Sequence, residues 1–558
     1  MRIILTIILA CLLSSSAFAQ APTWAWASSP QNISGGNTTV RTALDKDNNV
    51  YSVGVFGGSI SFGDSTYTSN IHIAIYVTKR DKNGNLIWSQ FIGGPEVYSP
   101  SSIAVDSAGA VYIGGTTATD TPNATALWKD MLLVKLNASG QIAWRKWYGT
   151  KFNDEITGLA IDSKNNLVFT GYFSNSYLND SLKLGDLVLV GQGDDDIFIA
   201  KIDSSGKVFW VRDIGSKRSE NAYSLALTFN DAMVIVAGFD GGVTLDNLTP
   251  LRSICGVGIS GDFFVAAFDS SGNAQWAQVV GGDPVTQQAA SGAVTCTFSS
   301  IDSSGNVYVG GNYSAANLKI GSFVLPQPYD NQGSFDFWFA KISSQGAVLW
   351  AKRAGGMNDD GLYGLAADRA GNLYLTGEAG DACIFDSDTV HVPLTAFEHM
   401  YVAKYDDKGT LKWLKSNGGI GNSFGYDIVV NNDDEVVVVG GFSDAALAFG
   451  KSVVFNTGSG NGFVAKLNKE GVGVPPTIAG QFIISPNPAS NTLQLQTQQA
   501  GQFSSYQISN ALGQKVGSGI LKSQTQQSIV LPDLVDGMYY LSLSGRAGVV
   551  TRKVIVQH

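Results

Sequence analysis

Seven tryptophans recur through most of the chain, separated by 56 to 74 residues. They are Trp26, Trp88, Trp144, Trp210, Trp276, Trp350 and Trp413. Several follow an apolar stretch ending in Lys or Ala and a polar turn around Gly, and Gly-Gly often comes shortly after the Trp. A period above about 50 residues is typical of a radial repeat array rather than of one continuous core. Residues present in every copy are then scaffold, and a unique site must lie where the copies differ.

Each repeat also contains two short apolar runs that flank a polar Gly-Asn turn, which predicts a β-hairpin. Examples lie at 103–114, 159–171, 301–310 and 365–377. A variable loop, a strand of the form F-x-A-K and the Trp strand follow. Four strands are the size of one propeller blade. The mature chain lacks helical periodicity, so we expect an all-β protein with a seven-bladed propeller over residues 22–472.

The ends of the repeat region complement each other. The seventh copy ends near residue 471 without a Trp strand, whereas Trp24-Ala25-Trp26 has no F-x-A-K strand before it. We therefore predict that residues 23–28 complete the seventh blade, which closes the ring and removes two exposed strand edges.

The run G-G … D-x-x-G-N-x-Y-x-x-G … F-x-A-K-x-D-x-x-G-x-x-x-W resembles the bacterial seven-bladed β-propeller repeat called the SBBP repeat. The resemblance covers all seven copies. It implies the propeller fold and an extracellular setting. Because the family's biochemistry is not uniform, it implies little about function.

The chain begins with the pattern of a secretory signal peptide over residues 1–19. Arg2 precedes an apolar run from Ile3 to Leu13, and cleavage is expected after Ala19. No later segment reaches about 18 unbroken apolar residues, so we expect no transmembrane span. The mature protein is therefore expected to be exported through the periplasm.

After a linker at 473–481, residues 482–558 form a module of short alternating strands that predicts a small β-sandwich. It resembles the type A C-terminal sorting domain of the type IX secretion system of Bacteroidota. The matching residues are Pro486, Asn487, Pro488, Gly537, Tyr539 and Lys553. The resemblance implies contact with the type IX machinery, passage across the outer membrane, and then release or attachment at the cell surface. A small binding sandwich is the alternative.

Charge and cysteine content limit the partners. The net charge is −10, with 36 basic and 46 acidic residues, and no basic stripe is present. This argues against nucleic acid, because binding it requires neutralised phosphates. The mature chain keeps Cys255, Cys296 and Cys383. Either Cys255 bridges Cys296 or all three are buried thiols. We expect a monomer.

No motif assigns a catalytic residue, a metal site or a cofactor. The four histidines show no zinc spacing, and no nucleophile elbow or P-loop is present in a credible setting. Asp45-x-Asp47-x-Asn49 faintly resembles a calcium loop, but it lacks the central Gly and the distal Glu. It also falls where other repeats have their hairpin turn, which Asp and Asn favour by bonding their own backbone.

Two groups of residues are candidates for ligand binding. Acidic and amide residues recur in the loops between blades, which meet on one face of a propeller: they could hold a cation or sugar hydroxyls, or simply cap strand ends. Blade 5 adds enlarged loops with aromatics beside amides, as sugar or peptide recognition requires. The candidates are Asp154, Glu155, Asp359, Asp360, Tyr329, Asn331 and Trp338.

These observations predict a secreted or cell-surface, non-catalytic propeller that binds a glycan or a protein. One alternative is an extracellular polysaccharide hydrolase or lyase, which would need suitably separated carboxylates or a base in a cleft. The other is a structural component of the surface or matrix.

Overall fold

The computed structural model describes residues 22–558 except for 95, 120–128, 176–180, 255–261, 283–293, 316, 327–333, 381, 387, 391, 393–397, 418–420, 470–481, 487, 498–502, 511–514 and 546–547. The chain separates into two compact units, Ala21–Glu470 and a second that contains Gly471–His558. The described residues form strands and turns only, and they include no helix that could cross a membrane.

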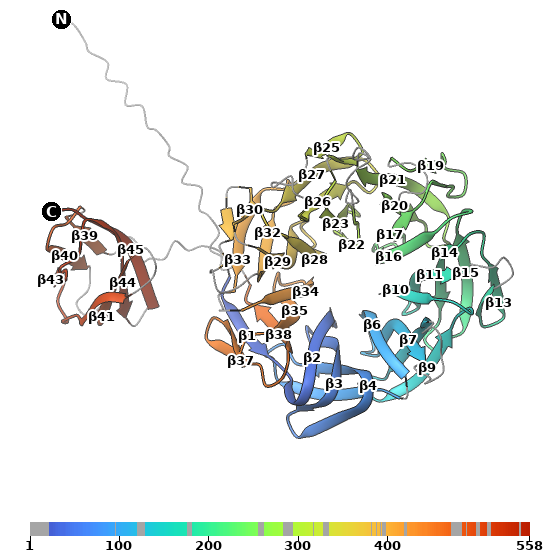
Figure 1. Ribbon diagram of the computed structural model, residues 1–558, viewed down its shortest axis with the longest axis horizontal. Coiled ribbons are helices and arrows are strands. Elements are labelled where there is room, and N and C mark those ends of the chain that lie inside the picture. The colour runs from blue at the N-terminus through green and yellow to red at the C-terminus, as the bar shows by residue number, and fades with distance from the viewer. Residues whose placement is uncertain are drawn as a thin grey trace, which may run out of the picture. The chain divides into compact units, whose positions relative to one another are not determined.

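The first unit is a ring of seven antiparallel sheets, one for each blade (Figure 1). Blade 1 contains β2 (Gln31–Leu44), β3 (Val50–Phe62), β4 (Ser65–Arg80) and β5 (Leu86–Ile92), and blade 2 contains β6 (Glu96–Val105), β7 (Val111–Thr119), β8 (Lys129–Leu136) and β9 (Ile142–Tyr148). Blade 3 contains β10 (Asp154–Ile161), β11 (Leu167–Ser174), β14 (Asp195–Ile202) and β15 (Val208–Ile214). Blade 4 contains β16 (Glu220–Leu227), β17 (Met233–Phe239), β20 (Asp262–Phe268) and β21 (Ala274–Gly282). Blades 5 to 7 are β22 (Phe298–Ile301), β23 (Val307–Tyr313), β26 (Asp336–Ile342), β27 (Val348–Ala354); β28 (Gly361–Ala367), β29 (Leu373–Ala379), β32 (His399–Tyr405), β33 (Leu411–Ser416); and β34 (Ser423–Val430), β35 (Val436–Phe442), β38 (Asn461–Leu467), β1 (Trp24–Ser28).

Five two-stranded hairpins occupy the loops between the second and third strands of blades 3 to 7. They are β12 (Ser181–Leu184) with β13 (Leu187–Val190), β18 (Gly242–Val243) with β19 (Leu251–Arg252), β24 (Asn317–Ile320) with β25 (Phe323–Pro326), β30 (Cys383–Phe385) with β31 (Asp388–Val390), and β36 (Ala446–Phe449) with β37 (Ser452–Phe455). Strand β24 also pairs with β21, so the sheet of blade 4 has six strands.

The first strand of each blade faces the centre of the ring (Figure 1). A central cavity of about 150 Å³ is lined by residues from all seven of these strands, among them Arg41, Ser101, Thr157, Ser224, Ser299, Leu365 and Asp427. Apolar side chains of neighbouring blades pack against one another, which forms the core of the ring.

Strand β1 closes the ring, as the sequence predicts. It pairs antiparallel with β38, with Trp24 opposite Leu467 and Ser28 opposite Val464. The Trp24 ring also meets the Phe449 ring edge-on at 4.8 Å. Blade 7 is therefore assembled from the two ends of the propeller sequence.

The repeated Trp joins each blade to the next. Five indole Nε1 atoms donate to a turn carbonyl of the following blade at 3.0 to 3.3 Å, in the pairs Trp26–Lys82, Trp88–Ala138, Trp144–Ser204, Trp276–Ser344 and Trp350–Asp407. The turn Gly lies against the indole. At Gly140, for example, φ is +84° and a Cβ would approach the Trp88 ring to 2.7 Å. The turn therefore requires Gly both for its backbone conformation and for the space.

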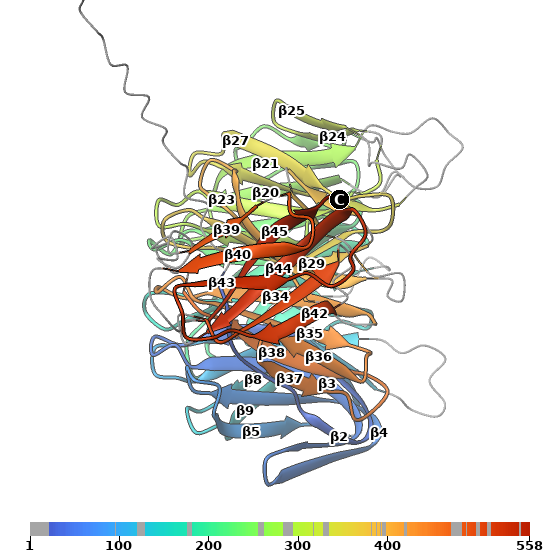
Figure 2. The same ribbon diagram turned by 90° about the vertical axis from the view of Figure 1, so that its left-hand side faces the viewer.

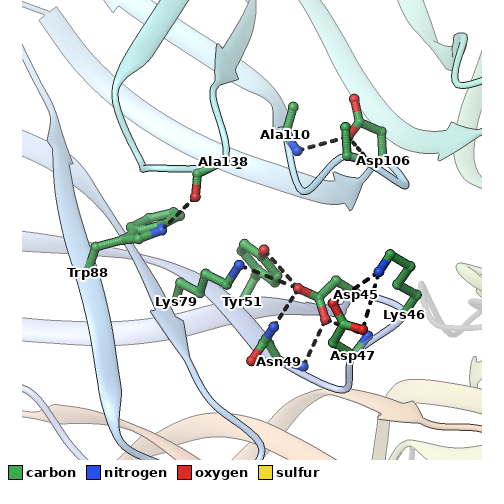
Figure 3. A network of polar contacts seen from close by, with 11 residues as sticks. Asp45, Lys46, Asp47, Asn49, Tyr51, Lys79, Trp88, Asp106, Ala110 and Ala138 are labelled. Carbon is green, nitrogen blue, oxygen red and sulfur yellow. Dashed lines mark hydrogen bonds and ion pairs between the residues drawn. The ribbon is translucent and has the colours of Figure 1, made fainter.

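The repeated Asp closes the hairpin turn (Figure 3). Oδ1 of Asp45 accepts hydrogen bonds from the backbone N–H groups of Asp47 and Asn49, both at 2.9 Å. Its Oδ2 accepts from Asn49 Nδ2 at 2.8 Å and the Tyr51 hydroxyl at 3.1 Å, and Lys79 Nζ lies 3.5 Å away. This carboxylate serves its own turn, as the turn interpretation expects.

In four blades a Gly at the end of the Trp strand or directly after it makes room for a carboxylate. A Cβ added at Gly149, Gly215, Gly281 or Gly355 would lie 1.6 to 2.4 Å from the side chain of Asp130, Asp196, Asp262 or Asp336 respectively. These acids occupy equivalent places near the start of the third strand. The Gly that the sequence repeats is thus a packing requirement of the end of the blade where the linkers run.

Cys296 and Cys383 are buried free thiols in the cores of the blades. Cys255 lies outside the described residues.

The second unit is a sandwich of two sheets (Figure 2). One sheet holds β39 (Phe482–Ser485), β40 (Thr492–Thr497) and β43 (Gln526–Val530); the other holds β42 (Lys515–Ile520), β41 (Ser505–Asn510), β44 (Gly537–Gly545) and β45 (Gly548–Val556). Leu493, Leu495, Ile508, Leu541 and Leu543 share its core, which draws on both sheets.

The sorting-motif residues lie at edges and turns of this sandwich. Pro486 directly follows β39, Pro488 is exposed, and Gly537 begins β44 opposite Val556. Tyr539 is 6% exposed and donates its hydroxyl hydrogen to the Val535 carbonyl at 3.0 Å. Lys553 lies on β45 opposite Tyr540. Asn487 and the cleavage residue Ala19 fall outside the described residues.

Candidate functional site

The propeller has two different ends. We call the end with the turns between first and second strands the hairpin end, and the opposite end, where each blade passes to the next, the linker end. At the linker end, six of the innermost strands carry a β-bulge at the same place, which leaves one residue without a partner on the second strand. These residues are Val40, Ser101, Thr157, Tyr223, Tyr363 and Tyr426. A bulge re-aims a side chain, and three of these residues, Ser101, Thr157 and Tyr223, line the central cavity.

A pocket of about 310 Å³ opens at the linker end over blades 3 and 4. Its lining residues are Asn153, Glu155, Thr157, Tyr172, Ser174, Asp195, Asn221 and Tyr223. They come from the innermost strands of two blades and from the second and third strands of blade 3. Carboxylates, amides, hydroxyls and tyrosine rings therefore converge on one small volume.

The contacts in this pocket fix its polar groups. The Tyr172 hydroxyl donates to Glu155 Oε2 at 3.3 Å, and the Ser174 hydroxyl donates to Asp195 Oδ1. The Tyr223 ring packs against the Phe263 ring, with 5.6 Å between the ring centroids. Tyr223 is 38% exposed. Tyr223 thus presents an accessible aromatic surface held from behind.

Burial changes the acidity of these groups. It raises the pKa of Glu155, although Lys129, the Tyr172 hydroxyl and Arg41 oppose the rise. Burial also raises the pKa of Tyr172, as does the Glu155 carboxylate. Tyr172 therefore stays a neutral hydrogen-bond donor at every physiological pH.

A second cluster of the same kind lies at the linker end over blades 6 and 7. The Tyr363 hydroxyl donates to Glu378 Oε1, and the rings of Tyr363 and Tyr426 lie 6.1 Å apart. The Asn422 amide donates to Glu398 Oε2 at 3.2 Å. Burial raises the pKa of Glu378 to about 7, against the hydrogen bond from Tyr363 and with help from the charges of Glu398 and Asp359.

The two clusters occupy corresponding positions. Tyr223 and Tyr426 are the bulge residues of blades 4 and 7, and Asp195 and Glu398 both stand near the start of a third strand. Tyr172 and Glu378 occupy equivalent places on the second strand. Two of the seven blade junctions therefore present tyrosines beside carboxylates.

A larger cavity, about 870 Å³, lies further out at the linker end of blades 3 and 4. Its guanidinium groups are largely neutralised: Arg218 pairs with Asp240 at 2.9 Å, and Arg212 pairs with Asp246. Because these charged groups already bind each other, this cavity offers a ligand fewer free polar groups for its size than the pocket of about 310 Å³ does.

The predicted acidic residues divide into buried and exposed groups. Asp154 and Asp360 are 0% and 1% exposed. Asp154 accepts from Thr150 N at 2.6 Å and Ser174 N at 3.1 Å, and Asp360 accepts from Gly380 N at 2.8 Å. Burial raises the pKa of both carboxyl groups to about 7. These two residues therefore stabilise the strand ends, and of the predicted acids only Glu155 lies in the pocket.

Asp359 is exposed, and its Oδ1 accepts from Phe335 N at 2.9 Å. Trp338 was expected near an exposed loop surface, and this expectation is wrong. The side chain is fully buried in the core between blades 4 and 5, and its indole donates to the Thr295 carbonyl at 2.9 Å. Tyr329 and Asn331 lie outside the described residues.

The sequence did not single out the tyrosines of either cluster. A usable signal existed, because the bulge residue varies from Val, Ser and Thr to Tyr among otherwise similar copies. This variation can be recognised only when the pairing of the first two strands is known, because the pairing shows which residue is the bulge residue. Within the described residues, no group of three or more His, Cys, Asp and Glu side chains is arranged to hold a metal ion.

The fold and its repeated blade motif define a β-propeller repeat protein. A model of the β-propeller repeat SBBP matches residues 87–120, and a model of the secretion system C-terminal sorting domain matches residues 484–557. The chain thus carries SBBP repeats followed by a type IX sorting domain, which directs it out of the cell or to the cell surface.

Other similarities are distant. The chain is 25% identical over 469 residues to an uncharacterized WD repeat-containing protein, L264, of Acanthamoeba polyphaga mimivirus. That match covers 70% of this chain but 33% of the relative, so the chain spans about a third of its length.

Among solved structures, Sqt1 from Chaetomium thermophilum is similar at a TM-score of 0.32 and 11% identity, covering 64% of this chain and 81% of Sqt1. A puromycin hydrolase is similar at a TM-score of 0.35 and 10% identity, covering 85% of this chain and 62% of the hydrolase. Scores of this size carry no argument about function.

Proposed function

We propose that this chain is a secreted or cell-surface, non-catalytic binding protein that takes a glycan at the linker end of its propeller. The observation that carries the proposal is the pocket over blades 3 and 4, where Glu155, Asp195, Asn221 and Tyr223 converge. The sorting domain supports the extracellular setting, where glycans are abundant partners.

The pocket has the groups that sugar recognition needs. Sugar hydroxyls both donate and accept hydrogen bonds, so carboxylates as acceptors and an amide as donor and acceptor can orient them. The half-exposed ring of Tyr223 offers a face for the apolar side of a sugar ring. The volume of about 310 Å³ is at the small end of ligand pockets, which suits one or two sugar units of a longer chain.

The test is a panel of purified polysaccharides exposed to the full-length protein, with bound protein and released reducing ends measured together. We expect saturable binding without product. Tyr223→Ala should weaken binding about tenfold, equivalent to about 1.4 kcal/mol. Phe209→Ala is the matched control, since Phe209 is 51% exposed on the outer strand of blade 3, away from the pocket.

Three outcomes would contradict the proposal. Binding that Tyr223→Ala leaves unchanged would place the site elsewhere. Release of reducing ends would show an enzyme, with Glu155 and Asp195 as the first carboxylates to replace. Failure to bind any polysaccharide would favour a protein partner or a structural role.

A further inference from the structure

Blade 4 departs from the charge pattern of the other blades at the hairpin end. In blades 1, 3 and 5 the acid that opens the hairpin turn meets the Lys of the third strand, and in blade 7, where Asn431 opens the turn, Glu435 at its end does so. The ion pairs are Lys79–Asp45 at 3.5 Å, Lys201–Asp162 at 2.7 Å, Lys341–Asp302 at 3.5 Å and Lys466–Glu435 at 2.8 Å. In blade 4 the position of the acid is Thr228 and that of the Lys is Ala267. Both charges are therefore lost together.

The strand register confirms that these positions are equivalent. Ala267 pairs with Val234 across the sheet, as Lys201 pairs with Val168 in blade 3. In both blades this Val lies six residues after the turn residue, Thr228 or Asp162. Blade 4 thus differs from blade 3 by removal of one acid and one lysine.

The turn itself is preserved without its charge. The Thr228 hydroxyl oxygen accepts from Ala232 N at 3.0 Å, just as Asp45 Oδ1 accepts from Asn49 N at 2.9 Å. A neutral cap therefore replaces the carboxylate. The loss of charge is not accompanied by loss of the hairpin.

A cavity of about 340 Å³ lies at the positions of the two missing charges. Thr228, Val234 and Ala267 all line it, together with Phe229, Asn230, Ala232, Met233, Phe268, Gln275, Trp276, Ser303, Ser304, Gly305, Val307 and Ser344. None of these lining residues, all within the described part of the chain, is charged. The indole of Trp276 donates to the Ser344 carbonyl at 3.0 Å, which fixes one wall.

Phe229 stands at this cavity and is 64% exposed. Phe229 also lines a neighbouring cavity of about 290 Å³, which Asp162, Asp231 and Asp302 line as well, and the Arg369 guanidinium lies 5.9 Å from the centroid of the Phe229 ring. An exposed aromatic beside an uncharged, partly apolar cavity is an arrangement suited to a ligand that buries an apolar group.

We propose that the hairpin end of blade 4 is a binding site for a small uncharged molecule with an aromatic or compact apolar body, seated where blades 1, 3, 5 and 7 hold their ion pair. Phe229, Met233 and Trp276 pack against its apolar body, and hydroxyl and amide groups of the lining bind a single polar substituent. This site is separate from the glycan pocket, which lies at the opposite end of the propeller.

The test uses indole and 2-naphthol as probes, titrated into the full-length protein by calorimetry. We expect saturable binding at one site. The double variant Thr228→Asp, Ala267→Lys rebuilds the pair that blade 3 already accommodates, so it should fold and should weaken binding at least tenfold. Phe229→Ala should weaken binding severalfold, with Phe209→Ala, another exposed Phe, as the control without effect.

Absence of saturable binding of both probes would overturn the proposal. So would binding that survives the double variant, or binding that survives Phe229→Ala if the double variant does not fold. Polysaccharide binding is expected to be unchanged in these variants, so failure of this site and failure of the glycan pocket are distinguishable.

Discussion

The hairpin end and the linker end use the same acidic residue types in opposite ways. At the hairpin end burial would raise the pKa of Asp45 and Asp162, but hydrogen bonds outweigh it and the pKa falls below its usual value: those of the turn at Asp45, and at Asp162 first the one from Lys201 and then those of the turn. At the linker end burial dominates and raises the pKa of Asp154, Glu220 and Asp360 to about 7. The difference shows that a carboxylate that accepts hydrogen bonds from its own turn stays charged and stabilises that turn. At the linker end the acids that are costly to keep charged are buried at equivalent places at the start of the innermost strands, where they stabilise the strand ends.

The largest expected effect breaks the hairpin end. Asp162 accepts from Lys164 N, Asn166 N and Asn166 Nδ2 and pairs with Lys201 at 2.7 Å. Asp162→Ala leaves a mostly buried lysine unpaired, so we expect the free energy of unfolding to fall by about 3 kcal/mol or more. Denaturant titration measures this change.

The control for that loss is Asp269→Ala in blade 4. Asp269 accepts the same kind of turn hydrogen bonds, from Ser271 N and Asn273 N, but no ion pair with it is recorded in the described residues. We expect a cost of about 1 kcal/mol for the turn alone. Equal losses in the two variants would show that the buried ion pair adds nothing.

An effect comparable in size to the loss in Asp162→Ala is expected in how the free energy of unfolding depends on pH, which differs between the acids of the two ends. An acid whose pKa is raised on folding contributes stability that is complete below its unfolded value near 4 and is lost as the pH rises through about 7. Stability from the linker-end acids should therefore decline between about pH 4 and pH 7. Asp360→Asn cannot ionise, so its free energy of unfolding should match that of the wild type near pH 3 and exceed it by about 4 kcal/mol at pH 8.

The acids of the hairpin end should change the free energy of unfolding with pH in the opposite direction. The lowered pKa of Asp45 contributes stability above its usual value of 3.8, which is lost as the pH falls below it. Asp45→Asn should therefore bring no gain at pH 8. A difference between Asp360→Asn and wild type that does not change with pH would refute the linkage.

The smallest expected effect concerns the contact between blades. Trp88→Phe removes the hydrogen bond from the indole to the Ala138 carbonyl while keeping an aromatic ring (Figure 3). We expect a loss of about 1 kcal/mol in the free energy of unfolding. Trp210→Phe serves as the comparison, because no such bond is recorded for Trp210 in the described residues. An equal loss there would assign the effect to packing.

The fold could be predicted almost completely because repetition reveals it. Seven copies of one motif report the same strands and turns, and the incomplete last copy reveals the closure by Trp24–Ser28. The roles of the repeated Trp, Gly and Asp are local, so they follow from short stretches of sequence. The complementary loss of Asp and Lys in blade 4 was visible in the copies as well, although its meaning required the register.

The candidate site could not be predicted in the same way. The side chain of Tyr223 reaches the pocket because a bulge changes its direction, and no local sequence pattern announces that bulge. Trp338 misled because an aromatic outside the repeat pattern can fill a core gap as readily as it can stack on a ligand. Only the burial of each side chain separates these two cases.

The closing strand has a consequence for how the molecule comes to exist. Ser29 and Gly462, which share a hydrogen bond beside that strand, are 433 residues apart in the chain. The segment made first must therefore wait for its partner until nearly the whole propeller has emerged, and contacts so distant in sequence form slowly. Until β1 pairs with it, β38 has an unpaired edge that another chain could join. The ring therefore closes at a seam between its two most distant segments, where an unpaired strand edge favours joining of copies until both segments have met.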